Sequence, residues 1–257
     1  MMRGVIAGSL LLLILAGCTS SGGRHYDSGD EKGSPADVNA HLGIEYMRKG
    51  MYDSSLESLN KAVRQDPNMQ LAQVSLAILY ERLGEDDLAE EHYKKAYSIN
   101  RKDPVTLNAY GQYLCRRGEL EKADEMFRTA VKDPLYQMPE LVYTNAGICA
   151  RKRPDLELAE KYFRSALQRN PKYQPALQEM ARTSFAREQY LATRAYLQRL
   201  AGSASLTPEF LWIGVRTEAA LGDKNAMASY ALLLKNRFPE AEETQALIEW
   251  ERKSGER

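Results

Sequence analysis

Cysteine is the residue type in this chain with the clearest chemistry, because a thiol can be acylated, oxidised to a disulfide or deprotonated to a nucleophile. Three cysteines are present. Cys18 follows directly on an apolar stretch at the start of the chain, whereas Cys115 and Cys149 lie far inside it. The internal pair is separated by 34 residues, a spacing that recurs through the rest of the sequence. Neither internal cysteine stands near a histidine, so we expect modified thiols rather than a catalytic one.

Other reactive groups are sparse. The three histidines, His25, His41 and His92, are scattered, with no cysteine or carboxylate cluster at the spacing of a metal site. The sequence contains no nucleophile elbow, no phosphate-binding loop and no His–carboxylate pair on one predicted face. Basic and acidic side chains number 35 each, so no basic excess would attract nucleic acid. We therefore expect no enzyme, and no metal, cofactor, nucleic acid or small-molecule substrate.

The first residues resemble the signal peptide of a bacterial lipoprotein. The apolar run 5–15 ends in Leu15-Ala16-Gly17-Cys18, which resembles a lipobox, and Arg3 precedes the run. The run is too short to span a bilayer as a helix, which needs about 20 apolar residues. The resemblance implies removal of residues 1–17 and acylation of Cys18. Thr19, where inner-membrane lipoproteins carry Asp, implies an outer-membrane protein that faces the periplasm. The alternative is a buried N-terminal helix with an incidental cysteine.

Residues 18–35 predict a flexible tether behind the acylated cysteine. The stretch after Cys18 reads TSSGGRHYDSGDEKGSP and is rich in Ser, Gly and charge. Such a composition buries too little apolar surface to offset the entropy lost on ordering. A random coil of this length holds the next domain roughly 20–25 Å from the acyl chains.

From residue 36 to 240 the sequence repeats with a period near 34 residues. The units run over 36–69, 70–103, 104–137, 140–173, 174–206 and 207–240. Two prolines in the segment 133–139 explain the one longer interval, because proline stops a helix and lengthens the connection. Residues 241–257 predict a helix that caps the array, with Leu247, Ile248 and Trp250 as its apolar contacts.

Small residues recur where two helices of a unit must cross closely, and large residues pack between them. In the first four units the small positions hold Gly43, Ser55 and Ala62; Ala77, Ala89 and Ala96; Gly111, Ala123 and Ala130; Gly147, Ala159 and Ala166. The large ones hold Leu42, Tyr46 and Leu59; Tyr80 and Tyr93; Phe127; Phe163. Two later units are degraded: Ala181, Thr193 and Leu197; Gly214, Ala226 and Tyr230. This pattern resembles the tetratricopeptide repeat (TPR) and implies an all-α, right-handed α-solenoid of about six units.

The internal cysteines lie late in the first helices of units three and four. Because stacked units bring equivalent positions side by side, Cys115 and Cys149 could face each other. An oxidising compartment would then favour a disulfide. The alternative is a pair of buried free thiols that act as small apolar residues.

The first helices of a TPR array usually present residues 2, 5, 9, 12 and 13 of each unit to a groove. In the first three units these positions hold an apolar series that we predict to bind a partner segment, namely Ile44, Met47, Leu71, Val74, Ile78 and Val105. The same series also includes Glu81, Arg82 and Gln112. Later units offer a more polar groove with Thr144, Arg151, Lys152, Gln178 and Arg182. The alternative is that some apolar residues pack between units.

The whole chain resembles the type IV pilus biogenesis lipoproteins of the PilF/PilW type. Beyond the lipobox and the repeats, the resemblance rests on the segments 108–115, 133–136, 143–149 and 211–216. It implies a pilotin: an outer-membrane scaffold that binds secretin subunits and promotes their localisation and multimerisation. It also implies a disulfide between Cys115 and Cys149. The competing interpretations are a TPR lipoprotein that organises or activates peptidoglycan enzymes, and a structural spacer without a groove.

Overall fold

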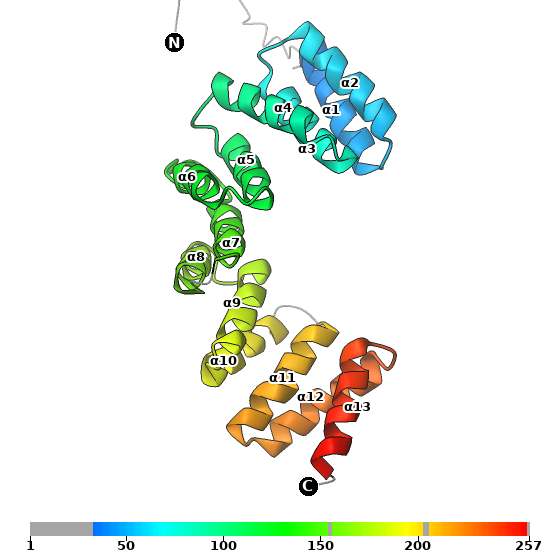
Figure 1. Ribbon diagram of the computed structural model, residues 1–257, viewed down its shortest axis with the longest axis vertical. Helices are drawn as coiled ribbons and strands as arrows, with labels where there is room; N and C mark the ends of the chain where they lie inside the picture. Colours follow the sequence, from blue (N-terminus) through cyan, green and yellow to red (C-terminus); the bar gives the residue numbers. More distant parts are fainter. Residues whose placement is uncertain (1–32, 154–155, 203–205, 256–257) are drawn as a thin grey trace, which may run out of the picture. The chain divides into compact units, whose positions relative to one another are not determined.

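Every regular element in the described part of the chain is an α-helix (Figure 1). The computed structural model describes residues 33–153, 156–202 and 206–255. Cys18 and the expected signal peptide lie outside these residues, and the helices all belong to one unit, Ser34–Arg257. The helices are α1 (Pro35–Arg48), α2 (Tyr52–Gln65), α3 (Gln70–Leu83), α4 (Asp86–Ile99), α5 (Pro104–Arg116), α6 (Leu120–Ala130), α7 (Pro139–Ala150), α8 (Leu156–Arg169), α9 (Gln174–Ala186), α10 (Tyr190–Ala201), α11 (Pro208–Leu221), α12 (Lys224–Arg237) and α13 (Glu242–Gly255).

The helices form six successive pairs, α1–α2 to α11–α12, followed by α13. Each helix packs against the next one along the chain, and the first helices of neighbouring pairs also touch. The predicted α-solenoid with a terminal helix is therefore confirmed. Each pair buries its apolar side partly against its neighbours, which joins the units into extended cores.

The small-residue pattern explains how the two helices of a pair approach each other. All the small positions predicted for the first four units are buried. Gly111 accepts the ring of Phe127, and a Cβ at Gly111 would come within 3.0 Å of that ring. Gly147 accepts Phe163 in the same way. Both rings are fully buried, so they have no room to move aside.

The turn between the two helices of a unit shows whether that unit keeps the repeat consensus. Gly84 and Gly118 follow α3 and α5 in the left-handed region, with φ of 80° and 83°, where glycine carries no steric penalty. At the corresponding turn of unit five, Glu188 holds φ of 57°. A non-glycine residue in this region is one local sign that unit five departs from the consensus.

Two apolar residues that were predicted to pack are instead exposed. Leu42 is 42% exposed and Ile248 is 48% exposed, whereas the neighbouring Leu247 is fully buried. A helix that packs on one side turns successive residues about 100° apart, so only one of Leu247 and Ile248 can point inward. The residues 131–138 form the longer connection between α6 and α7 that the prolines predicted.

Candidate functional site

The first helices of neighbouring pairs lie side by side with their C-terminal turns in contact. In α3, Arg82 Nη1 donates a hydrogen bond to the backbone oxygen of Met47 in α1 (3.3 Å). Just after α7, Lys152 Nζ donates to the backbone oxygen of Cys115 in α5 (2.8 Å). Because these bonds join the C-terminal ends of neighbouring first helices, the predicted groove positions of successive units lie side by side.

A hollow of about 390 Å³ lies between α3 and α5 at these positions. It is lined by Ile78, Glu81, Arg82, Tyr93, Ala109, Gln112 and Arg116. Ile78 and Ala109 give it apolar surface, and Gln112 contributes an amide whose Nε2 makes only a long bond to the backbone oxygen of Asn108 (3.4 Å). Its volume falls near the lower end of the range of about 300–1,000 Å³ that is usual for ligand pockets. We call it the α3–α5 hollow.

One wall of the α3–α5 hollow is a fixed polar cluster around Glu81. Arg116 Nε donates to Glu81 Oε1 (2.9 Å), and the Tyr93 hydroxyl donates to Glu81 Oε2 (2.7 Å). Burial, reinforced by the Glu81 charge, holds the pKa of Tyr93 well above its ordinary value, so the hydroxyl stays protonated. In the described part of the chain, Arg82 makes one hydrogen bond, to Met47, and retains N–H groups for a partner.

The six predicted groove residues do not form one exposed apolar strip. They are Ile44, Met47, Leu71, Val74, Ile78 and Val105. Ile78 lines the α3–α5 hollow and Ile44 is half-buried. Met47 and Val74 are only 6% and 5% exposed, and Met47 belongs to a core cluster with buried leucines, so the prediction is wrong for these two. Leu71 and Val105 are exposed, but Leu71 precedes Ile78 by about two helical turns.

The hollow also contains residues outside the predicted apolar groove series. Arg116 occupies the thirteenth place of unit three, so continuing the same series would have found it. Ala109 lies between two groove positions, and Tyr93 comes from the second helix of its pair, so the groove series signals neither.

Cys115 and Cys149 are joined in a disulfide between α5 and α7, with Cα atoms 5.8 Å apart. Their positions are not equivalent, contrary to the spacing argument: Cys115 follows Gly111 by four residues, and Cys149 follows Gly147 by two. The longer connection between α6 and α7 accounts for the difference. The same offset brings Phe185 of α9 against Arg216 of α11, with the guanidinium carbon 4.7 Å from the ring centroid.

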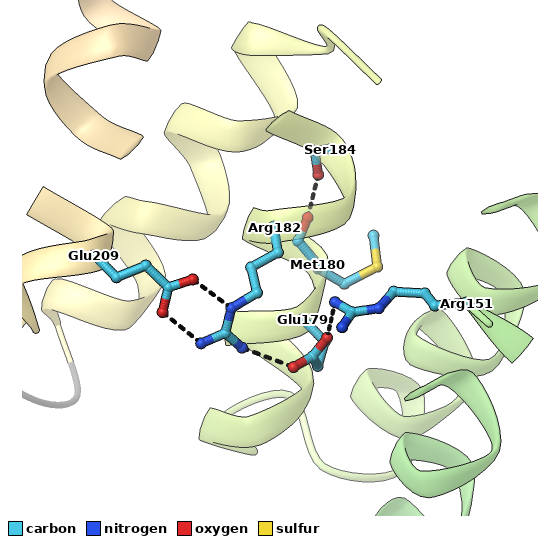
Figure 2. A network of polar contacts seen from close by, with 6 residues as sticks. All are labelled: Arg151, Glu179, Met180, Arg182, Ser184 and Glu209. Carbon is cyan, nitrogen blue, oxygen red and sulfur yellow. Dashed lines mark hydrogen bonds and ion pairs between the residues drawn. The ribbon is translucent and has the colours of Figure 1, made fainter. Parts of the chain in front are cut away.

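Further along the chain, ion pairs occupy the positions that correspond to those lining the α3–α5 hollow (Figure 2). Arg151, after α7, and Arg182 of α9 both bind Glu179 of α9. Arg182 also makes two hydrogen bonds of 2.6 Å to the carboxylate of Glu209 in α11. The Arg182 hydrogen bonds lower the pKa of Glu209, which keeps that carboxylate charged. Of the other polar residues predicted for this groove, Thr144 is buried and donates to a backbone oxygen in its own helix.

Two other features, a metal site and a membrane-spanning helix, are absent from the described residues. They contain no group of three His, Cys, Asp or Glu side chains placed to hold a metal ion. None of the described helices combines the length and apolar character needed to cross a bilayer.

Comparison with known proteins gives the family. The tetratricopeptide repeat family matches residues 41–104 and 109–174. The type IV pilus assembly protein PilF of Pseudomonas aeruginosa is 29% identical over 237 residues, which cover 92% of this chain and 94% of PilF.

Two solved structures extend the likeness to the fold. The crystal structure of PilW, described as a widely conserved type IV pilus biogenesis factor, has a TM-score of 0.75 at 30% identity and covers 84% of this chain and 99% of PilW. The solved structure of Pseudomonas aeruginosa PilF has a TM-score of 0.74 at 28% identity, covering 83% of this chain and 96% of PilF. The chain belongs to the tetratricopeptide repeat family and, within it, to the type IV pilus biogenesis proteins of the PilF and PilW type.

Proposed function

We propose that this protein is a pilotin, an outer-membrane lipoprotein that binds secretin subunits and promotes their assembly into the multimeric pore of the type IV pilus system. The observation that carries the proposal is the likeness to PilF and PilW over almost the whole chain. A helical-repeat scaffold without a metal cluster among its described residues is consistent with a binding role.

The α3–α5 hollow is the part of the scaffold that best suits a secretin segment. Its apolar surface at Ile78 and Ala109 fits an aliphatic or aromatic side chain of a helix or extended segment laid across the first helices. The Gln112 amide and the remaining N–H groups of Arg82 can then bond the backbone of that segment. The wall formed by Glu81 and Arg116 is already paired, so it shapes the hollow rather than adding net charge.

The second part of the proposed mechanism is the lipid anchor at Cys18. Acyl chains on Cys18 hold the scaffold at the inner leaflet of the outer membrane, and residues 19–34 give it a limited reach. Capture of secretin subunits by an anchored scaffold raises their local concentration at the membrane, which favours insertion and oligomerisation. A Cys18→Ala variant should therefore appear in the soluble periplasmic fraction and fail to localise the secretin. Normal secretin pores at the outer membrane in that strain would contradict the role of the anchor.

Site-specific photocrosslinking tests the hollow directly. A photoreactive phenylalanine analogue at Gln112 should form an adduct with the secretin in living cells, because Gln112 lines the α3–α5 hollow and a probe there would lie beside the bound segment. The matched control is the same analogue at Leu191 in α10, a side chain that is 71% exposed and outside the hollow. Secretin adducts of equal yield at both positions, or adducts with a cell-wall enzyme in place of the secretin, would count against the proposal. Met47 is unsuitable for this test because its substitution would disturb the core.

A further inference from the structure

The segment 211–216, which the generic repeat pattern does not require, builds a second contact surface far along the chain from the α3–α5 hollow. The guanidinium carbon of Arg216 lies 4.7 Å from the ring centroid of Phe185 in α9 and 5.9 Å from that of Trp212 in α11. Trp250 of α13 meets Trp212 edge-on, with centroids 6.4 Å apart. The Arg216 guanidinium thus contacts one ring of α9 and one of α11, and the α11 ring contacts a third ring on α13. We call these four residues the aromatic–arginine site.

Arg216 has no acidic partner among the described residues, in contrast to three arginines of the segment from α9 to α10. Arg182, Arg187 and Arg194 each bind at least one glutamate in the described part of the chain. Arg216 is exposed, and its interactions among the described residues are the two ring contacts. Its positive charge is therefore available to a partner.

Stacking gives this cation a defined geometry. Two ring faces beside the guanidinium group restrict the Arg216 side chain. The N–H groups at the edge of the plane stay free, and their fork matches the two oxygens of a carboxylate. Tryptophan and arginine are also the residue types that most often dominate binding energy at protein interfaces. An acidic side chain with apolar neighbours has the complementary chemistry.

We propose that Phe185, Trp212, Arg216 and Trp250 form a binding site for an acidic segment of a partner protein. A glutamate or aspartate carboxylate of that segment pairs with the edge of Arg216, and its aliphatic neighbours pack on the tryptophan rings. The site lies on α9, α11 and α13, whereas the hollow lies on α3, α4 and α5. It therefore does not depend on secretin binding, and the scaffold holds two partners at separate places.

Tryptophan fluorescence reports on this site alone, because the chain contains two tryptophans and both belong to it. The purified full-length chain is titrated with hexaglutamate as the probe. A saturable change in fluorescence is expected, with an affinity that weakens as salt is added. Arg216→Gln should lower the affinity at least about tenfold, because the charge-assisted bonds are lost. The matched control is Arg237→Gln, which removes an exposed arginine of α12 and should leave the affinity unchanged.

Thermal unfolding of each variant separates lost binding from lost folding. If Arg216→Gln lowers the melting temperature, Arg216→Lys provides the test, since it keeps the charge but removes the planar fork and should still weaken binding. The proposal is overturned if hexaglutamate leaves the fluorescence unchanged, or if folded Arg216 variants bind it as well as the unaltered chain. A response to phosphatidylglycerol vesicles in place of the peptide would also overturn it, by assigning the cation to lipid.

Discussion

The groove-facing side chains of the first helices serve different purposes in the two halves of the array. Between α3 and α5, Ile78 and Gln112 leave open volume beside a paired polar wall. Further along the chain, Arg151 after α7 pairs with Glu179 of α9, and Arg182 of α9 pairs with Glu209 of α11, so that ion pairs occupy the corresponding surface (Figure 2). The same architectural positions thus surround an open hollow in one half and are filled by ion pairs in the other.

The repeat pattern also changes along the chain, from four consensus units to two degraded ones. In the first four units, buried glycine, serine and alanine residues let the helices of a pair approach closely. In units five and six the corresponding positions include Thr193 and Leu200, and Ala226 is only half-buried. Arg182 of unit five and Glu209 of unit six form an ion pair that joins these two units.

The largest effect is expected at the boundary between the halves, where the disulfide joins α5 to α7. Replacing both Cys115 and Cys149 by alanine opens a loop with a sequence separation of 34 residues. The chain-entropy model gives a loss of about 3–4 kcal/mol in the free energy of unfolding. Urea denaturation of the oxidised chain and of the double variant measures it. An unchanged midpoint would show that packing alone holds the two halves together.

The ion network should contribute more stability than an exposed ion pair within a single helix of the first half. Glu179→Gln weakens contacts to Arg151 and Arg182 in a nearly buried position and should cost about 2 kcal/mol, less than a fully buried pair because both arginines are partly exposed. Glu45→Gln, which breaks an exposed pair with Arg48 in α1, should cost at most about 0.5 kcal/mol. Equal losses in urea denaturation would remove the proposed contrast between the halves.

The glycine packing of the first four units can be tested with a single methyl group. Gly147→Ala places a Cβ against the buried ring of Phe163 and should lower the free energy of unfolding by about 1–2 kcal/mol, since overpacking outweighs the gain in helix propensity. Gly202→Ala adds the same group after α10 at ordinary contact distances, 3.5 Å from the nearest atom, and should be nearly neutral. The sign of the difference between the two melting temperatures decides whether close approach is required at Gly147.

The smallest expected effect is a difference between the two halves in how stability depends on acidic pH. His92 of α4 stacks on Tyr80, and burial, with Lys95 nearby, lowers its pKa. The unfolded chain then binds a proton more readily than the folded one, so stability falls as the pH drops below about 6.5. Glu209 also has a lowered pKa, through Arg182, so its contribution is lost only as the pH falls below about 4.3.

Melting temperatures across this pH range distinguish the two contributions. His92→Gln should flatten the loss between about pH 7 and 5 and leave the loss at lower pH intact. A variant whose melting temperature still falls as steeply between these values would show that another group causes the early loss.

Local pattern was enough to predict the fold. The spacing of Gly111, Gly147 and their aromatic partners predicted helix pairs, and the prolines in residues 133–139 predicted the longer connection. The pattern could not say which apolar residues are covered by a neighbouring unit. Met47 was assigned to a groove and lies in a core, because coverage depends on how two first helices cross.

The candidate sites were harder to predict, because each depends on contacts between units. The α3–α5 hollow includes Tyr93 from a second helix, which no series along the first helices indicates. The sequence predicted the disulfide pair from equivalent positions in stacked units, and the structure contains that pair. The two positions are not equivalent, however, because they differ by two residues relative to Gly111 and Gly147. Arg216 stood in a segment that the repeat did not explain, and only its ring contacts reveal a site.

The most direct test of the central claim is deletion of the gene in the native host, followed by an immunoblot of the secretin under conditions that preserve its heat-resistant multimer. A pilotin predicts that the multimer disappears while the monomer remains, and that the unaltered gene restores the multimer. Normal amounts of multimer in the deletion strain would contradict the claim and direct attention to peptidoglycan enzymes as partners.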